Sequence, residues 1–358
     1  MYQRCKAYNI PCKQIGKLVV ARENQRSYIE ALHSKSLSLK PPKYSTHDVT
    51  PILSTKLLSK EETREMEPDL SEDIVASLWC PMTGIVDSHA FMESLEKDIQ
   101  ESEGAELVYA TKVVRVDAYK KSGKVDIVPD TEAAEEGWVV QASSKGEGTS
   151  SVLARNLINA SGLGSTMVLN SILPNEQRIP MYYARGSYAS YHGPGLSNVN
   201  HLIYPCPQTR PNKHALESLG SHLTLDLHGK IRFGPDIEWL NPPNLESTGN
   251  EEDGDFWMKQ LIPDDSRLQE MHEAVTSYLP KVILEGLQPD YCGVRTKLRP
   301  PGGGFHDFLI RKDYPSIEAE WNRSGAMISM LGIESPGLTA SLAIAELVVE
   351  DILKKEKI

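Results

Sequence analysis

Short apolar runs and helical repeats alternate along the first half of this 358-residue chain. The apolar run at 17–21 predicts a strand, and helical spacing follows at 23–39 and again at 60–67. Further on, runs rich in β-branched residues predict four strands, at 107–109, 113–116, 125–128 and 138–141. This half of the chain therefore combines helices with an antiparallel meander.

A longer helix is predicted over 89–101, just before the meander. Phe91, Leu95 and Ile99 recur there every four residues, a spacing that predicts one buried stripe. Ser88 stands immediately before this pattern and is the expected N-cap, because its hydroxyl can accept a hydrogen bond from a free N–H of the first turn.

Two segments have the pattern of a buried strand followed by small residues and a helix. The apolar run at 156–160 is typical of a parallel strand buried on both faces, and it leads into 161–165. The run at 326–331 leads in the same way through 332–339 into the closing helix. That helix carries apolar residues along one side, among them Leu338, Leu342, Ala345 and Val349.

Between these junctions lies a second β-rich region, from about 178 to 238. His222 and Thr224 alternate there with leucines, which predicts a strand with its polar side chains on one face. A helix is predicted near 265–279. Since buried parallel-type strands and antiparallel meanders occur in one chain, the sequence predicts a mixed α/β fold of two interleaved domains.

Composition narrows the classes of function. The chain has 38 Lys+Arg against 49 Asp+Glu, a formal charge of −11, which argues against a nucleic-acid partner. Its five cysteines are scattered without metal-ligand spacing, so we expect reduced thiols in an intracellular compartment and no metal site. No apolar run approaches the roughly 18 residues of a transmembrane segment.

The two strand-to-helix junctions are the first candidate binding elements. Glycines at such a corner let the backbone approach a ligand, and the free N–H groups of the helix favour negative charge. The residues concerned are Ala160, Ser161 and Gly162 at the first junction, and Gly332, Ile333, Gly337, Leu338 and Thr339 at the second. The alternative is that both are ordinary turns in which glycine supplies a positive φ.

Arg295 and Arg185 are candidate carboxylate ligands, because an arginine on an apolar strand can hold a carboxylate through two parallel hydrogen bonds. The alternative for Arg295 is a surface ion pair with Asp307 or Glu334. His222, with Thr224 on the same strand face, is a candidate base. Its alternative is a structural histidine.

Taken together, these segments resemble the FAD-dependent oxidoreductases of the D-amino-acid-oxidase-like superfamily, and within it the L-2-hydroxyglutarate dehydrogenases. The matching stretches occur in family order and cover nearly the whole chain. They lie at 10–11, 16–21, 81–87, 158–162, 219–224, 233–235, 291–295 and 332–339.

The resemblance implies an incomplete Rossmann-like FAD-binding domain interleaved with an antiparallel β-sheet substrate domain. On this interpretation the substrate domain is formed by 1–80 and 173–290, and the FAD-binding domain by 81–172 and 291–358. The family motif G-x-G-x-x-G, which seats the FAD pyrophosphate, is absent from these 358 residues. We therefore expect the chain to be an amino-terminally incomplete copy.

The resemblance also implies oxidation of a small 2-hydroxy acid by hydride transfer to FAD, with an electron acceptor that the sequence does not identify. Arg295 would hold the substrate carboxylate, and His222 would act as base with Thr224 beside it. Val114 and both junctions would contact FAD. The alternatives are an amino-acid, amine or glycerol-3-phosphate oxidase of the same fold, or a non-catalytic fragment without FAD. Both a mitochondrial and a cytoplasmic location remain open.

Overall fold

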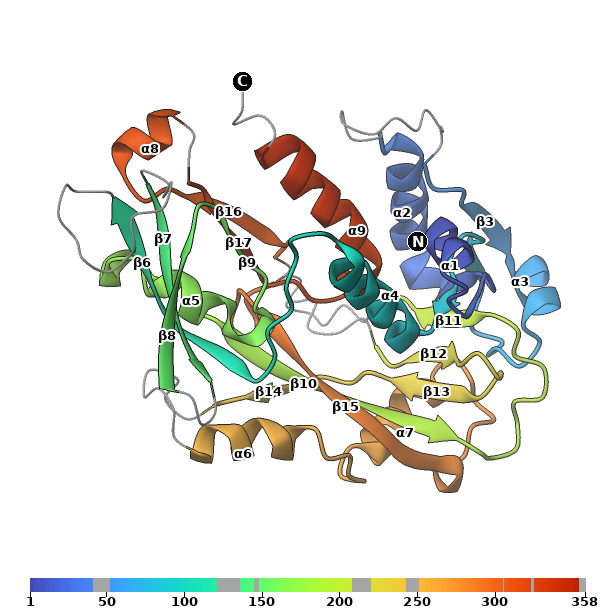
Figure 1. Ribbon diagram of the computed structural model, residues 1–358. Coiled ribbons are helices and arrows are strands. Elements are labelled where there is room, and N and C mark those ends of the chain that lie inside the picture. Colours follow the sequence, from blue (N-terminus) through green and yellow to red (C-terminus); the bar gives the residue numbers. More distant parts are fainter. Residues whose placement is uncertain are drawn as a thin grey trace.

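The computed structural model describes residues 1–40, 52–120, 136–144, 148–207, 220–242, 251–304, 306–322 and 325–353. Within these residues the chain has a mixed α/β fold with several sheets, as the sequence predicted (Figure 1). The division into two interleaved domains stays a prediction. Strand β15 (Leu287–Lys297) runs across its expected boundary at residue 290.

The largest sheet of the described part has nine strands, in the order β14-β10-β13-β12-β11-β2-β4-β3, with β15 also paired to β10. Neighbouring strands are antiparallel except β11 and β2, which are parallel. The strands besides β15 are β2 (Lys17–Ala21), β3 (Lys56–Ser59), β4 (Ala76–Cys80), β10 (Tyr182–Tyr191), β11 (Leu202–Pro205), β12 (His222–Leu225), β13 (Ile231–Gly234) and β14 (Glu238–Leu240).

The main hydrophobic core lies on this sheet, between its apolar side chains and helix α7 (Leu268–Thr276). Leu223 and Leu225 of β12 point into the core, as their alternation with polar residues predicted. Met271 and Val275 of α7 are buried against them. His222, expected on a polar face, is nevertheless buried, because the ring of Tyr204 on the neighbouring strand stacks on it.

Two smaller sheets lie toward the other end of the molecule (Figure 1). One contains β9 (Leu157–Asn159), β17 (Met327–Leu331) and β16 (Leu309–Asp313), with β9 parallel to β17. The other is the meander of β6 (Thr111–Lys120), β7 (Glu136–Ser144) and β8 (Gly148–Ala154). A core that includes Trp138 and Met327 joins the two.

Helices and short elements complete the described part. The helices are α1 (Tyr2–Ala7), α2 (Arg26–Ser38), α3 (Lys60–Met66), α4 (Ser88–Glu101), α5 (Ser165–Asn170), α6 (Glu251–Gln260), α8 (Ile317–Asn322) and α9 (Gly337–Glu346). The short elements are β1 (Cys12–Lys13), β5 (Ile85–Val86), η1 (Glu23–Gln25), η2 (Gly162–Gly164), η3 (Asn175–Gln177), η4 (Leu284–Gly286) and the π-helical turn η5 (Leu347–Leu353).

Local predictions for the first half differ from the structure at three places. Residues 107–109 form no strand, whereas the strand predicted at 125–128 lies outside the described residues. The N-cap of α4 is Asp87, whose carboxylate accepts a hydrogen bond from Ala90 N at 3.0 Å, so that Ser88 is already the first helical residue. Of its predicted stripe Phe91 is fully buried and Leu95 packs against the same core, but Ile99, in the last turn of α4, is not part of that core and is 39% exposed.

Strand β9 of the first junction and helix α9 of the second are both more exposed than the sequence predicted. Strand β9 is parallel as expected, but it is not buried on both faces, since Ile158 is 46% exposed. Ile344 of α9 and Val348 of the following turn η5 pack against the core that contains Ile328 of β17. Of the side predicted to be buried, Leu342 packs against the core between α1 and α4, whereas Leu338 and Val349 are exposed.

Candidate active site

The two junctions and strand β15 surround a cavity of about 630 Å³. It is lined by Lys17, Thr83, Gly84, Gly162, Leu163, Leu202, Tyr204, Val294, Arg295, Thr296, Ile333, Glu334, Ser335, Pro336, Gly337, Leu338 and Thr339. A second cavity of about 370 Å³ adjoins it and shares Gly162, Ile333 and Gly337. Its other lining residues are mostly apolar: Ile158, Ala160, Met330, Ser341, Ile344, Ala345, Val348 and Val349.

The corner after β9 is held by the side chain of Asn159. Its Nδ2 donates to the carbonyl oxygen of Ser165 at 2.8 Å and to Ser329 Oγ at 3.3 Å, while its Oδ1 accepts from the hydroxyl of Ser161 at 2.5 Å. Gly162 follows with φ of +56°, and a Cβ built on it would meet no atom within 4 Å. The corner is thus rigid, and its glycine leaves open space on the cavity side.

The second junction brings the start of helix α9 to the same cavity. Gly332 has φ of +64°, and a Cβ there would lie 2.8 Å from Leu298. A Cβ on Gly337, the first residue of α9, would lie 2.7 Å from Ile333. Gly337, Leu338 and Thr339 all line the cavity. The N-terminal turn of α9 therefore supplies N–H groups and the positive end of a helix dipole to this space.

Arg295 lies on β15 at the edge of the large cavity and is half-buried. Its Nη2 donates to the hydroxyl of Tyr188 at 3.3 Å, and the Tyr188 ring stacks on Tyr291 with centroids 4.2 Å apart. Glu334, one of its two alternative partners, binds Lys297 at 2.7 Å instead. Within the described residues no carboxylate forms an ion pair with Arg295, so its charge faces the cavity with a neutral partner.

Three side chains of this site have no counterpart in the sequence prediction: Tyr188, Tyr204 and Lys17. Tyr204 lines the cavity, its ring stacks on His222 with centroids 3.7 Å apart, and Lys17 Nζ lies 4.8 Å from its centroid. Burial raises the pKa of Tyr204, so the phenol stays protonated and can donate a hydrogen bond. The only sequence signal for Tyr204 is a hydroxyl-bearing residue within the apolar run that forms β11.

The remaining predicted residues do not line either cavity. His222 lies behind Tyr204, and the hydroxyl of Thr224 donates to the carbonyl oxygen of Arg232 at 3.4 Å. Val114 is 41% exposed on β6. Ser161 and Gly332 shape the two corners next to lining residues.

Arg185 is enclosed in a network of its own. Its side chain is 7% exposed, and it pairs with Asp264 at 2.9 Å and with Glu238 at 3.3 Å. The same guanidinium donates to the carbonyl oxygens of Gln260 and Ile262 at 3.0 and 2.7 Å. Its donors are therefore committed within the fold.

The described ranges contain no group of three or more histidine, cysteine, aspartate or glutamate residues placed to hold a metal ion. In the same part of the chain, every helix is too short or too polar to cross a bilayer.

Comparison with known proteins decides the family. The model of the DAO family, described as FAD dependent oxidoreductase, matches residues 1–351. The chain belongs to this family. FAD is accordingly the cofactor that its fold is built to bind, as the sequence resemblance implied.

Individual members of the DAO family are similar to this chain over most of its length. A mitochondrial L-2-hydroxyglutarate dehydrogenase of Arabidopsis thaliana is 28% identical over 99% of this chain and 69% of its own length. A glycerol 3-phosphate dehydrogenase of Caloramator mitchellensis is 23% identical, and the chain spans 58% of its length. The FAD-bound L-alpha-glycerophosphate oxidase of Mycoplasma pneumoniae superposes with a TM-score of 0.64 at 19% identity, covering 95% of this chain and 73% of that one.

The described residues fit the ring system of the DAO cofactor. A flavin ring is flat and largely apolar, and the two adjoining cavities have an apolar wall formed by β9, β17 and α9. Gly162 provides open space at one corner, and the α9 N-terminus provides hydrogen-bond donors at the other. If the ring occupies these cavities, the residues that would hold it are Ala160, Gly162, Ile333, Gly337 and Leu338, which line them.

Proposed function

We propose that this member of the DAO family oxidises a small 2-hydroxy acid of the 2-hydroxyglutarate type. FAD, when bound, supplies the acceptor for the hydride that leaves the hydroxyl-bearing carbon. The similarity to the L-2-hydroxyglutarate dehydrogenase of Arabidopsis thaliana supports this substrate class.

The observation that supports the proposal most is the environment of the Arg295 guanidinium. A guanidinium facing a cavity of about 630 Å³, with only a tyrosine hydroxyl as a side-chain partner in the described residues, has donors left for a ligand. A carboxylate can accept two parallel hydrogen bonds from it. Tyr188 holds the guanidinium from behind, and the stack with Tyr291 fixes that tyrosine.

Substrate chemistry would take place between Arg295 and the first turn of α9. Both border the large cavity, so an acid held by Arg295 lies over the apolar wall that fits the flavin. The N–H groups of Leu338 and Thr339 would stabilise negative charge at that end, whereas the N–H of Gly337 donates to the carbonyl oxygen of Glu334.

His222 is our candidate for the group that accepts the hydroxyl proton; it stacks on the cavity residue Tyr204, and since a ring stack carries no proton, the role requires that the proton reach the edge of the imidazole. His222→Phe keeps an aromatic ring for the stack but removes the proton acceptor, whereas His222→Ala removes both. If His222 is the base, both variants slow flavin reduction and lose its rise from acidic to neutral pH. A normal rate and pH profile in His222→Phe assigns the base elsewhere.

The test of the function is a matched substrate panel. Protein reconstituted with FAD is assayed with 2-hydroxyglutarate, glycerol 3-phosphate and amino acids, using one artificial electron acceptor. We expect flavin absorbance in the purified protein and the highest kcat/KM with 2-hydroxyglutarate. Protein without flavin absorbance after reconstitution would instead be a non-catalytic fragment, which contradicts the proposal.

Glycerol 3-phosphate is the second candidate substrate. It is favoured by the similarity to the Caloramator mitchellensis dehydrogenase and by the superposition on the Mycoplasma pneumoniae oxidase, which shows the fold. Arg295 could bind a phosphate as well as a carboxylate. The same panel decides between the two, because only one substrate can have the higher kcat/KM.

We propose an intracellular location, mitochondrial or cytoplasmic. In the described residues the five cysteines are free, which suits a reducing compartment. The Arabidopsis thaliana relative is named as mitochondrial. Fractionation of cells that express the full-length gene, with compartment markers, tests this.

A further inference from the structure

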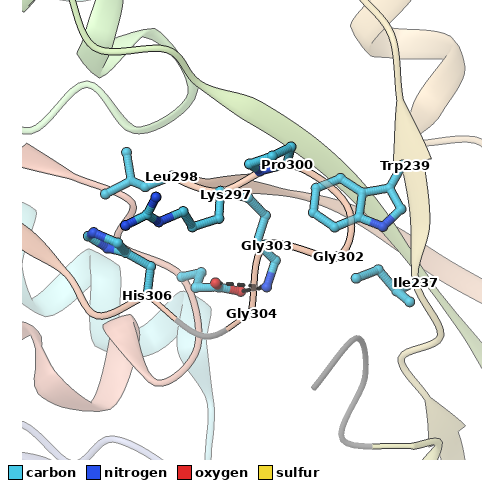
Figure 2. Close-up of a pocket in the computed structure, with 11 residues that line it drawn as sticks. Ile237, Trp239, Lys297, Leu298, Pro300, Gly302, Gly303, Gly304 and His306 are labelled. Carbon is cyan, nitrogen blue, oxygen red and sulfur yellow. Dashed lines mark hydrogen bonds and ion pairs between the residues drawn. The ribbon is translucent and has the colours of Figure 1, made fainter. Parts of the chain in front are cut away.

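A small cavity of about 70 Å³ lies beside the proposed substrate cavity, at the end of strand β15 (Figure 2). It is lined by Ile237, Trp239, Lys297, Leu298, Arg299, Pro300, Gly302, Gly303, Gly304, His306 and Glu334. Trp239 and His306 lie at opposite ends of it (Figure 2). Glu334 also lines the large cavity, so the two spaces share a wall.

Glu334, which lines both cavities, forms an ion pair with Lys297. Glu334 Oε2 lies 2.7 Å from Lys297 Nζ, which also donates to Oε1 at 2.8 Å (Figure 2). Both side chains are mostly buried, with 26% of Lys297 and 18% of Glu334 exposed. An anion entering the small cavity therefore meets a carboxylate that is already neutralised.

Arg299 gives the small cavity its positive charge. No carboxylate of the described residues lies within ion-pair distance of Arg299, which is exposed at the rim. His306 Nδ1 is 2.7 Å from the carbonyl oxygen of Asp307. Because a carbonyl only accepts, Nδ1 carries the hydrogen, and Nε2 of the neutral ring is an acceptor that donates to no carboxylate.

Three glycines, Gly302, Gly303 and Gly304, line the small cavity. Gly302 and Gly304 both have φ of +76°, a conformation that favours glycine, and a Cβ on Gly302 would meet no atom within 4 Å. A small anionic group can therefore approach the loop backbone closely.

The spacing of the two arginines suits one ligand with two acid groups. Arg295 and Arg299 are four residues apart, so their Cα atoms are separated by at most about 14 Å. Each side chain reaches several bonds toward the cavity it lines. The two guanidinium groups therefore border neighbouring cavities that have Glu334 in common, and the single uncommitted charge of Arg299 balances a single carboxylate.

We propose that the small cavity is a second anion subsite, in which Arg299 binds the distal carboxylate of a dicarboxylic 2-hydroxy acid while Arg295 binds the carboxylate beside the reacting carbon. The subsite rests on the proposed function and adds to it a preference for dicarboxylates over monocarboxylates. Trp239 lies in the cavity wall and provides an optical signal for its occupation.

Ligand binding to the protein as purified tests this subsite without any assay of turnover. Glutarate, butyrate and glycerol 3-phosphate are each titrated while tryptophan fluorescence and calorimetric heat are recorded. We expect glutarate to bind about tenfold more tightly than butyrate, since one charge-assisted hydrogen-bond pair is added. Only glutarate should change the fluorescence, and Trp239→Phe should remove that change without altering the calorimetric affinity.

Arg299→Gln should reduce the affinity for glutarate to that for butyrate and leave butyrate unchanged, and Arg299→Lys should fall between. Arg115→Gln is the matched control, because Arg115 is an exposed arginine on the distant strand β6 and should leave both affinities unaltered. Circular dichroism melting curves verify the fold of each variant.

The outcomes separate the subsite from the function on which it rests. An unchanged glutarate-to-butyrate ratio in Arg299→Gln overturns the subsite, as does equal binding of both acids by the unmodified protein. Tighter binding of glycerol 3-phosphate than glutarate overturns the choice of a distal carboxylate. If Arg295→Leu binds both acids normally, the proposed function itself fails, whatever Arg299 does.

Discussion

Two arginines on neighbouring strands of this protein have opposite environments. Arg185 of β10 pairs across the sheet with Val294, whereas Arg295 of β15 pairs with Ala184. Because successive side chains of a strand point to opposite faces, the two guanidinium groups leave the same ladder on opposite sides. Arg185 meets two carboxylates and two carbonyl groups, while Arg295 meets a tyrosine hydroxyl and a cavity.

The difference teaches how to distinguish a structural arginine from a ligand-binding one. On the sequence the two are equivalent, since each lies in an apolar strand. In the fold, strand β14, the end of helix α6 and the segment after α6 supply the partners of Arg185. Despite burial, the pKa of Arg185 is raised by its hydrogen bonds to Asp264 and its other acceptors. What identifies a binding arginine is therefore the absence of carboxylate partners beside an open space, not its presence on a strand.

The largest expected effect is the loss of stability when Arg185 is replaced. Arg185→Leu leaves the carbonyl groups of Gln260 and Ile262 and the carboxylate of Asp264 without their donor. Breaking such a buried network costs about 2–4 kcal/mol, at the lower side of the usual range because Asp264 and Glu238 are partly exposed. Urea denaturation measures the loss. Equal stability of Arg185→Leu and the control Arg115→Leu would contradict the structural role.

Replacement of Arg295, the arginine that borders the large cavity, should weaken substrate binding and leave the fold intact. Arg295→Leu removes a charge-assisted contact that contributes about 2–3 kcal/mol, so KM for 2-hydroxyglutarate should rise about 30- to 160-fold. The urea midpoint should change little, since no carboxylate of the described residues depends on Arg295. Steady-state kinetics of the FAD-reconstituted variant checks this, and an unchanged KM would remove Arg295 from the site.

A smaller effect is expected from the residue that positions Arg295. Tyr188→Phe keeps the stack on Tyr291 but removes the hydroxyl that accepts from Nη2 at 3.3 Å. One neutral acceptor contributes about 1 kcal/mol, so KM should rise about fivefold at nearly constant kcat. A fall in kcat without a change in KM would show that Tyr188 acts on the chemistry instead.

The smallest expected effect is a pH dependence of stability that comes from Asp264, a partner of the enclosed Arg185. Hydrogen bonds from Ser266, and then the Arg185 guanidinium, lower the pKa of Asp264 from 3.8 to about 2. Because the folded value is the lower one, the carboxylate stabilises the fold at pH above 3.8, and this contribution is lost as the pH falls toward about 2. The difference in urea midpoint between the unmodified protein and Asp264→Asn should shrink over that window. A constant difference would exclude the ionised carboxylate as its source.

Much of the secondary structure was predictable because it depends on short-range pattern. The strand at 17–21, the helix at 60–67 and the parallel strand before Gly162 all formed near their predicted positions. The mixed α/β class and the FAD-dependent family also followed from motifs in the chain. Failures occurred where packing overrides pattern: the apolar stripe of α9 faces a cavity, and the predicted strand at 107–109 is irregular.

The candidate site was likewise only partly predictable from the sequence. The chemical types were evident from the sequence: glycines at two strand-to-helix corners and arginines on apolar strands. Tyr188, Tyr204 and Lys17 were not, since they come from strands β10, β11 and β2, and no local pattern relates these strands to one another. His222 was noticed for its alternation, yet its position behind Tyr204 depends on how β11 pairs with β12.

The sequence by itself determined the elements, the family and the two glycine corners, because helix and strand periods, turn residues and motif order are properties of neighbouring residues. Only the tertiary structure decided which arginine faces open space and which is enclosed. That choice depends on the register of β10 against β15 and on which loop covers each face, and both are set by contacts between residues far apart in the chain.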